Sequence, residues 1–194
     1  MSVSVNRNEV SLIAGKWRSR KITFAEEVGL RPTHSRIRET LFNWLAPIIE
    51  NSVCLDAFSG SGALGFEALS RGAKQVTFCE LSKKVMQTLQ KNALLLKADN
   101  AEFIQVDFTS SQFIVNKKFD VVFLDPPFQK ELLLKSCELL ISRALLNTDA
   151  LIYLECEKNS VDFSLLPACF TIEKHKQTQT IDYVLVRVAM LTAK

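Results

Sequence analysis

Short apolar runs bounded by polar or turn-forming residues recur along the chain from residue 53 onward. Such runs predict β-strands, whereas longer segments with apolar residues three and four positions apart predict helices that bury one face. Strands are expected at Val53–Asp56, Gln75–Glu80, Phe103–Asp107, Phe119–Asp125 and Leu151–Glu155. Helices are expected at Ala63–Ser70, from Ser82 to about Lys97, and from about Lys130 to Arg143. This alternation indicates an α/β fold in which a parallel sheet is covered on both faces.

Both ends of the chain depart from this alternation. Two further strands, Phe170–Lys174 and Tyr183–Met190, have no helix between them and predict a closing antiparallel hairpin. The stretch SLIAGKWRSRKITF (11–24) predicts a short hairpin, and a helix follows to about Ala46, capped by Thr33 or Ser35. The chain is therefore expected to divide into an N-terminal extension, 1–46, and a main domain, 47–194.

Length and composition suit one globular domain with a small extension. The chain has 194 residues, of which 47% are hydrophobic and 23% are charged. No stretch free of Asp, Glu, Lys and Arg exceeds ten residues, which excludes a membrane-spanning helix. The first residues lack the apolar core of a signal peptide, so a cytoplasmic location is expected. Five cysteines without a Cys-x-x-Cys pair, and only two histidines, predict reduced core thiols and no metal site.

A glycine-rich loop follows the first predicted strand of the main domain. Gly60, Gly62 and Gly65 have the spacing that brings a backbone close to a nucleotide cofactor. Glu80 ends the next strand, where its carboxylate would accept hydrogen bonds from ribose hydroxyls. On spacing alone, NAD is a fair candidate. Asp56 argues against NAD, because a carboxylate there would repel a pyrophosphate and attract a cationic cofactor such as S-adenosylmethionine.

Two simpler interpretations stand beside this one. The glycines also suit a plain tight turn with Asp56 as a cap, and Asp107 is either an acceptor for an adenine amino group or a solvated acid at a strand end. The candidate cofactor-binding residues are Asp56, Phe58, Gly60, Gly62, Glu80, Leu81, Asp107 and Phe108.

The segment FLDPPF (123–128) ends a predicted strand with a carboxylate and two prolines. An exocyclic base amine is a poor nucleophile, because its lone pair is delocalised into the ring. Asp125 and the Pro126 carbonyl would accept its N–H bonds and turn the lone pair toward a sulfonium. Pro127 stiffens this corner and Phe128 would stack on the base, so all four are candidate catalytic residues. Taken alone, Asp-Pro-Pro also suits an ordinary turn.

Over about residues 10–190 the chain resembles a known family, the bacterial 16S ribosomal RNA guanine-N2 methyltransferases of the RsmD type. The similar segments are LDAFSGSGALGFEALSRGA (55–73), DPPF (125–128), GLRPTHSRIRETLFNWL (29–45) and IAGKWRSRKI (13–22). The helix segment is the most specific of them, since the first two occur in many amino-methyltransferases. One mild departure is Ser59, where relatives carry another small residue, alanine.

The resemblance implies a Rossmann-like class I methyltransferase fold: a mostly parallel seven-stranded sheet with a C-terminal antiparallel hairpin and a small N-terminal extension. It implies S-adenosylmethionine as methyl donor and the N2 amine of one 16S rRNA guanine, position 966 in the usual numbering, as acceptor. An assembled or partly assembled small subunit is the implied partner, and no membrane or metal is implied.

Positive charge is concentrated in the N-terminal extension. The net charge of the chain is +3, yet residues 11–40 hold seven bases against three acids. Strand alternation in a hairpin at 11–24 would place Arg18 and Arg20 on one face, toward phosphates. A plain solvated face is the alternative for any single residue. The candidate RNA-binding residues are Arg18, Arg20, Lys21, Arg31, Arg36 and Arg38.

Three rival functions remain open on the sequence. The first is an amino-methyltransferase of another substrate, such as DNA adenine or a protein glutamine; DPPF and the basic extension favour nucleic acid but do not separate guanine from adenine. The second is an NAD-dependent oxidoreductase, disfavoured by Asp56 and by the lack of a catalytic Tyr-Lys, His or Cys constellation. The third is a non-enzymatic RNA-binding module, which would leave the glycine loop and Asp125 unexplained.

Overall fold

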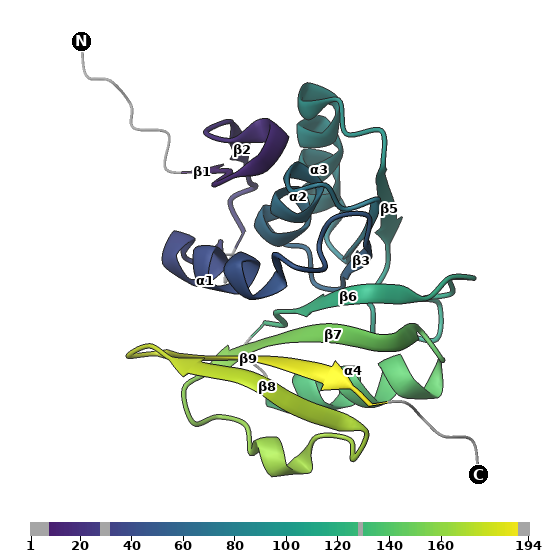
Figure 1. The fold of residues 1–194 in the computed structure, drawn as a ribbon. Helices are drawn as coiled ribbons and strands as arrows, with labels where there is room; N and C mark the ends of the chain where they lie inside the picture. The colour runs from purple at the N-terminus through teal and green to yellow at the C-terminus, as the bar shows by residue number, and fades with distance from the viewer. Residues whose placement is uncertain (1–7, 28–31, 128–129, 190–194) are drawn as a thin grey trace.

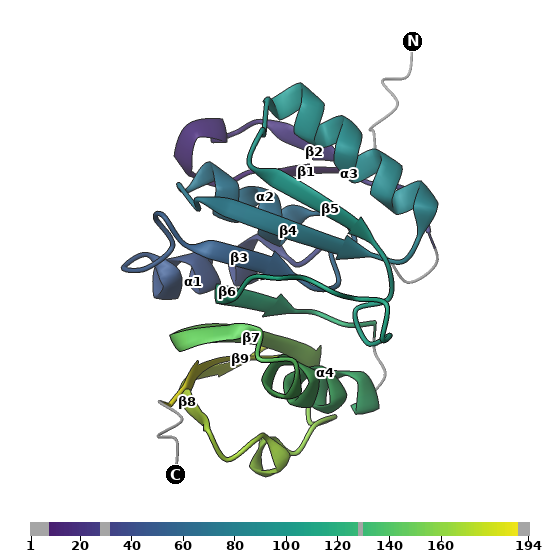
Figure 2. The same ribbon diagram turned by 90° about the vertical axis from the view of Figure 1, so that its right-hand side faces the viewer.

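A computed structural model describes residues 8–27, 32–127 and 130–189, and its centre is one seven-stranded sheet (Figures 1 and 2). The strand order is β5-β4-β3-β6-β7-β9-β8, and within this sheet β9 runs opposite to the other six strands. The strands are β3 (Val53–Asp56), β4 (Gln75–Glu80), β5 (Ala101–Gln105), β6 (Phe119–Leu124), β7 (Leu146–Glu157), β8 (Phe170–Gln177) and β9 (Ile181–Val188). The predicted mostly parallel sheet with a C-terminal antiparallel hairpin is confirmed.

Helices cover both faces of the sheet because alternate strand residues are apolar on both sides. The α-helices are α1 (Ser35–Leu45), α2 (Ala63–Ser70), α3 (Lys83–Leu96) and α4 (Lys130–Ser142). The first three share one core with Phe123 and Tyr153 of the central strands, whereas α4 packs with Leu124 and Leu154 on the opposite face. The predicted cap of α3 is confirmed, since the Ser82 side chain accepts a hydrogen bond from the Val85 amide. Among the described residues, no helix is long and apolar enough to cross a membrane.

The N-terminal extension begins with a small antiparallel pair, β1 (Glu9–Ser11) and β2 (Lys21–Thr23), joined through the 3-10 turn η1 (Gly15–Trp17). This hairpin lies against the end of α2, where Trp17 N donates a hydrogen bond to Ser70 Oγ over 3.0 Å. A Cβ on Gly15 would lie 1.8 Å from the Ser70 carbonyl oxygen, so only glycine permits this approach. The extension is therefore packed onto the main domain.

Several boundaries differ from the sequence prediction. β5 ends at Gln105, so Asp107 lies beyond the strand, and β7 begins earlier than expected, at Leu146. Residues before Leu151 extend β7 across an irregular register with β6. The end of the last predicted strand, at Met190, falls outside the described residues. A second 3-10 turn, η2 (Phe163–Leu165), precedes β8.

Candidate active site

The loops after β3 and β6 leave the sheet at its topological switch point. β3 pairs in parallel with β4 on one side and with β6 on the other. Connections from neighbouring strands diverge at such a point and leave a crevice at the carboxyl ends of the strands. The glycine loop after β3 and the Asp-Pro-Pro corner after β6 are therefore neighbours, as the sequence predicts.

The glycine loop is held in a left-handed backbone conformation by contacts with β3, β4 and α2. Gly60 and Gly62 have φ angles of 47° and 76°, where a side chain would be strained. Ser59, the one departure noted in the sequence, donates its hydroxyl hydrogen bond to the backbone carbonyls of Asp56 and Cys79, at 2.9 and 3.1 Å. A serine at this position therefore ties the loop to two neighbouring strands.

Asp56 lies at the end of β3 and is 2% exposed. Its Oδ2 accepts a hydrogen bond from the Gly65 amide over 3.0 Å. Burial raises the pKa of Asp56 to about 7, and the carboxylates of Asp125 and Glu80 raise it further while the Gly65 bond opposes the shift. A cation bound here would favour the charged form of Asp56.

Two other acids lie near this loop, Glu80 as the last residue of β4 and Asp107 two residues beyond the end of β5. Glu80 is half-buried and accepts hydrogen bonds from the Gly60 and Ser82 amides, at 3.0 and 2.8 Å. Asp107 accepts from both the amide and the hydroxyl of Thr109, at 2.7 and 2.8 Å. Each acid already organises backbone, which restricts the direction in which its remaining lone pairs point.

The apolar cofactor candidates differ in exposure. Leu81 is 66% exposed and Phe58 is half-buried, so both offer surface to a ligand. Phe108 is 1% exposed, with its ring against Phe58 and Phe113 at centroid distances of 5.9 and 5.0 Å. The side chain of Phe108 thus packs against Phe58, and its place in a cofactor site stays a prediction.

Asp125 follows β6 directly and is half-buried. The hydroxyl of Thr33 donates a hydrogen bond to Asp125 Oδ2 over 3.2 Å. Burial raises the pKa of Asp125 to about 6, against the lowering effect of this bond. Pro126 is buried and Pro127 is exposed, whereas Phe128 lies outside the described residues. The corner therefore presents a carboxylate supported on one side by the N-terminal extension.

Sequence reasoning missed a second acid beside this corner. Leu124 pairs with Leu154 in the register of β6 and β7, which brings Glu155 next to Asp125. Glu155 is 3% exposed and accepts a 2.6 Å hydrogen bond from the hydroxyl of Tyr153. Burial, and secondly the charge of Asp125, raise the pKa of Glu155 to about 8. The available signal is an acid that closes the apolar run LIYLE, which by itself indicates only the end of a strand.

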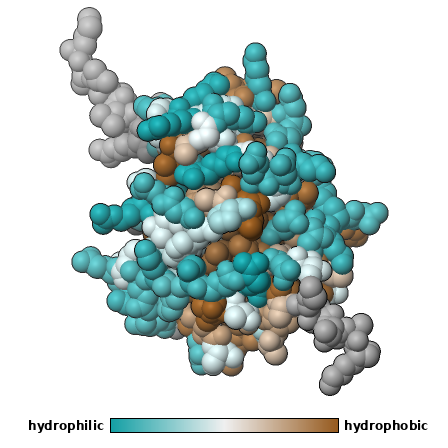
Figure 3. Space-filling view, in the orientation of Figure 1, coloured by the Kyte–Doolittle hydropathy of each residue, from teal (hydrophilic) through white to brown (hydrophobic). Residues whose placement is uncertain are grey.

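The candidate RNA-binding residues do not all lie at the surface. Arg18, Arg20, Lys21 and Arg36 are exposed, and Arg31 lies outside the described residues. Hydrophilic side chains cover most of the face shown in Figure 3. Arg18 follows η1 and Ser19 has a left-handed φ of 65°, so the expected alternation that would place Arg18 and Arg20 on one strand face is wrong. The guanidinium of Arg20 donates to the Leu95 carbonyl, and Lys21 pairs with Glu9.

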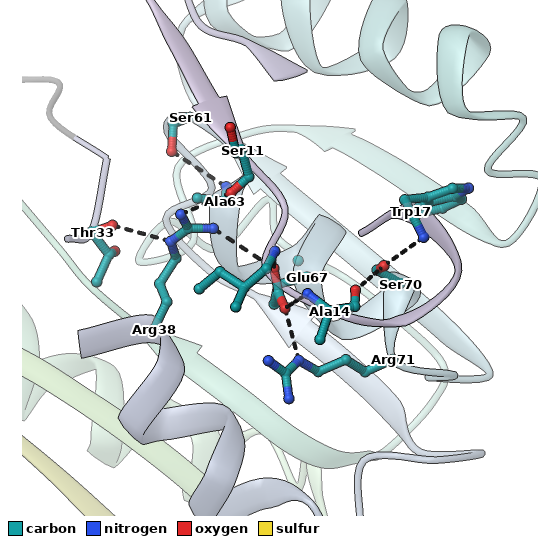
Figure 4. A network of polar contacts seen from close by, with 12 residues as sticks. Ser11, Ala14, Trp17, Thr33, Arg38, Ser61, Ala63, Glu67, Ser70 and Arg71 are labelled. Atoms are coloured by element: carbon teal, nitrogen blue, oxygen red, sulfur yellow. Dashed lines mark hydrogen bonds and ion pairs between the residues drawn. The ribbon is translucent and has the colours of Figure 1, made fainter. Parts of the chain in front are cut away.

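Arg38 is a further correction, because it is 1% exposed. Its guanidinium points into the molecule toward Thr33, Ser11 and Glu67 (Figure 4). A side chain buried in this way has no surface for RNA, and Arg38 is removed from the candidate RNA-binding residues.

Comparison with known proteins identifies the family. A family model described as "Conserved hypothetical protein 95" matches residues 10–187. The Ribosomal RNA small subunit methyltransferase D of Haemophilus influenzae is 46% identical over 181 residues, 91% of this chain and 93% of that protein. Its namesake from Escherichia coli strain K12 is 42% identical over 175 residues, 90% of this chain and 88% of that protein. The chain belongs to the ribosomal RNA small subunit methyltransferase D family.

Solved structures agree with this family membership. The Escherichia coli protein yhhF is 41% identical, with a TM-score of 0.86 over 93% of this chain and 98% of that chain. An RNA methyltransferase from Salinibacter ruber in complex with S-adenosyl-L-homocysteine has a TM-score of 0.65 over 84% of this chain and 97% of that chain. At 17% identity, the second likeness shows the fold alone. The predicted Rossmann-like methyltransferase fold and the predicted family are both confirmed.

Proposed function

We propose that the protein methylates the N2 amine of a guanine in 16S ribosomal RNA, with S-adenosylmethionine as methyl donor. The family relatives named as small-subunit ribosomal RNA methyltransferases support the reaction class and the RNA. The observation that carries the proposal is the place of Asp125, half-buried after β6 and one strand away from Asp56 and the glycine loop. A donor on one loop and an amine on the other would meet at the switch point.

Acids at or just beyond the carboxyl ends of β3, β4 and β5 suit this cofactor. Asp56 is a buried carboxylate whose raised pKa leaves it responsive to a nearby positive charge, and Glu80 and Asp107 are acceptors for the ribose and the adenine amino group. A pyrophosphate would instead meet acids at the ends of β3 and β4. When bound, S-adenosylmethionine supplies a methyl group activated by positively charged sulfur.

Asp125 and the Pro126 carbonyl are proposed to accept the two N–H bonds of the amine. This arrangement turns the N2 lone pair toward the methyl carbon, so that the new N–C bond forms in line as the C–S bond breaks. Positive charge moves onto N2, where an adjacent carboxylate stabilises it until a proton is lost. Burial raises the pKa of both Asp125 and Glu155, and the charge of Asp125 raises the pKa of Glu155 further, so Asp125 is proposed as the acid of the pair that ionises first.

The target guanine must be unpaired or flipped out of its stack, because the amine is otherwise out of reach of a carboxylate at a loop. Extrusion of a base costs a few kcal/mol, which phosphate contacts would offset. The exposed side chains of Arg18, Arg20, Lys21 and Arg36 are the proposed source of those contacts. An assembled or partly assembled small subunit is the proposed substrate.

Mass spectrometry of ribosomal RNA tests this function. Small subunits and free 16S rRNA from cells lacking the gene are incubated with S-adenosylmethionine and either the wild-type protein or Asp125→Ala. Wild type should add one methyl group to N2 of a single guanine, with subunits preferred over free RNA, and Asp125→Ala should add none. The same acceptor corner would also serve adenine N6 or a glutamine amide, so methylation of either, or no methylation by wild type, would overturn the guanine assignment.

A further inference from the structure

We propose that Thr33 and Arg38 are positioning residues that hold Asp125 for methyl transfer, an inference that rests on the proposed function. Thr33 lies just ahead of α1, where a threonine hydroxyl commonly caps the helix. Here the N-cap position belongs to His34, whose side chain makes no capping bond. The Thr33 hydroxyl instead donates to Asp125 Oδ2, across 92 positions of sequence. Thr33 is 7% exposed, so this bond is sheltered from competing water.

Arg38 in turn holds Thr33 through the backbone carbonyl of Thr33. Arg38 Nε donates a hydrogen bond to the Thr33 carbonyl over 3.2 Å, and Arg38 Nη2 donates to the Ser11 carbonyl over 3.0 Å (Figure 4). These two bonds join the segment before α1 to the end of β1. Because Thr33 is held from its carbonyl side, its hydroxyl has a defined direction toward Asp125.

The cost of burying Arg38 argues for a role beyond stability. A guanidinium in the interior loses hydration that its partners seldom restore in full. Arg38 Nη1 is buried, lacks a hydrogen-bond partner in the described part of the chain, and lies 3.8 Å from Glu67 Oε2. An apolar side chain of similar size would avoid this cost but would leave the Thr33 carbonyl unheld.

Glu67 connects this chain of contacts to the cofactor loop. It is fully buried on α2, the helix that follows the glycine loop, and accepts hydrogen bonds from the Ile13 and Ala14 amides at 2.7 and 3.0 Å. It also pairs with Arg71 at 2.7 Å. The hairpin, α2 and the segment before α1 thus meet at Glu67 and Arg38. From that segment, the Thr33 hydroxyl contacts Asp125. This assigns an inward role to Thr33 and Arg38 within the family-specific segment 29–45.

The kinetics of Thr33→Val test the inference. This near-isosteric variant removes only the donor to Asp125, so kcat should fall roughly ten- to hundredfold while cofactor affinity stays within about threefold of wild type. Thr33→Ser should restore most of the rate. Thr40→Val is the matched control, because the Thr40 hydroxyl donates only to the Arg36 carbonyl within α1 and its loss should leave kcat unchanged.

A pH titration separates positioning from general damage. Thr33 lowers the pKa of Asp125, and the titratable groups whose pKa the charge of Asp125 raises are Asp56 from β3 and Tyr153, Glu155 and Cys156 from β7. The acid limb of the kcat profile should therefore shift upward in Thr33→Val and return in Thr33→Ser. Equal losses in the valine and serine variants, or an unshifted profile, would overturn the inference.

A direct NMR titration of the Asp125 carboxyl keeps this inference distinguishable from the proposed function. Thr33→Val should raise that pKa in the protein alone, without RNA or cofactor. If wild type fails to methylate guanine but the pKa moves as expected, the function is wrong and the Thr33–Asp125 coupling stands. If wild type is active and the pKa does not move, the positioning role is wrong.

Discussion

The Gly65 amide donates a hydrogen bond to Asp56 Oδ2, with 3.0 Å between the two atoms. This bond joins the end of β3 to the first turn of α2, across the glycine loop. The carboxylate proposed to attract a cationic cofactor therefore also fixes the shape of the loop that would hold it. Its burial, and the pKa of about 7 that follows, make the charge of Asp56 measurable in solution.

Binding of S-adenosylmethionine near pH 7 should release protons. A positive charge near Asp56 lowers the pKa of a carboxyl that is about half protonated at that pH. In Asp56→Asn an amide oxygen still accepts from Gly65, but the charge is gone, so proton release should disappear and affinity should fall roughly tenfold. Calorimetric titration in two buffers of different ionisation enthalpy measures both quantities. Equal proton release in wild type and Asp56→Asn would contradict the assignment.

The buried acids should make the protein less stable as pH rises. Unfolded carboxyls lose their protons near pH 4, whereas the folded state keeps those of Asp125, Asp56 and Glu155 up to pKa values of about 6, 7 and 8. The folded state thus binds more protons in this window, and these groups lower the free energy of unfolding from about pH 4 to pH 8.

Urea unfolding at several pH values measures this slope. Glu155→Gln should flatten the dependence of unfolding free energy on pH at the high end of the pH range, where ionisation of Glu155 is most costly. Glu157→Gln, an exposed position at the end of the same strand, is the control and should keep the wild-type slope. A Glu155→Gln slope equal to that of wild type would show that Glu155 ionises without penalty.

Gly65→Ala should destabilise the fold by about 1–3 kcal/mol through overpacking. A Cβ at this position would lie 2.3 Å from Cε1 of Phe78 and 3.0 Å from Asp56 Oδ2. Phe78→Leu removes the ring edge, so the double variant should recover part of the loss relative to the sum of the single changes. Urea unfolding measures this loss in the free energy of unfolding. An unfolding midpoint for Gly65→Ala equal to that of wild type would contradict the prediction.

Neutralising the exposed bases of the extension should weaken RNA binding and reduce its salt dependence. Arg18→Gln and Arg36→Gln should each lower the slope of log affinity against log salt by about one if the residue contacts a phosphate. Lys118→Gln is the control, because this exposed lysine precedes β6 at the opposite end of the strand from Asp125. Unchanged slopes in both arginine variants would exclude Arg18 and Arg36 as phosphate contacts.

Local patterns were sufficient for much of the fold. The bounds expected for β3, β4 and α2 match the structure, because each element is a dense apolar run closed by glycine or acidic residues. The glycine loop and Asp125 were predictable as neighbours, since parallel strands end at one edge of a sheet.

The remaining features depend on partners far along the chain. Arg38 reads as a surface base until Glu67 and the Ser11 carbonyl are known to lie beside it. Thr33 reads as a helix cap until Asp125 is placed next to it. The burial of Glu155 follows from its position within the sheet. Each of these is a polar group whose role is set by tertiary contacts, which hydrophobic periodicity does not report.

The most direct test of the account compares two quantities in Asp125→Asn: the affinity for S-adenosylmethionine and the single-turnover rate of methyl transfer to small subunits. The account predicts an affinity within about threefold of wild type and a rate at least roughly a hundredfold lower, because the residue acts on the amine and not on the cofactor. An equal loss of affinity and rate, or a wild-type rate, would contradict it.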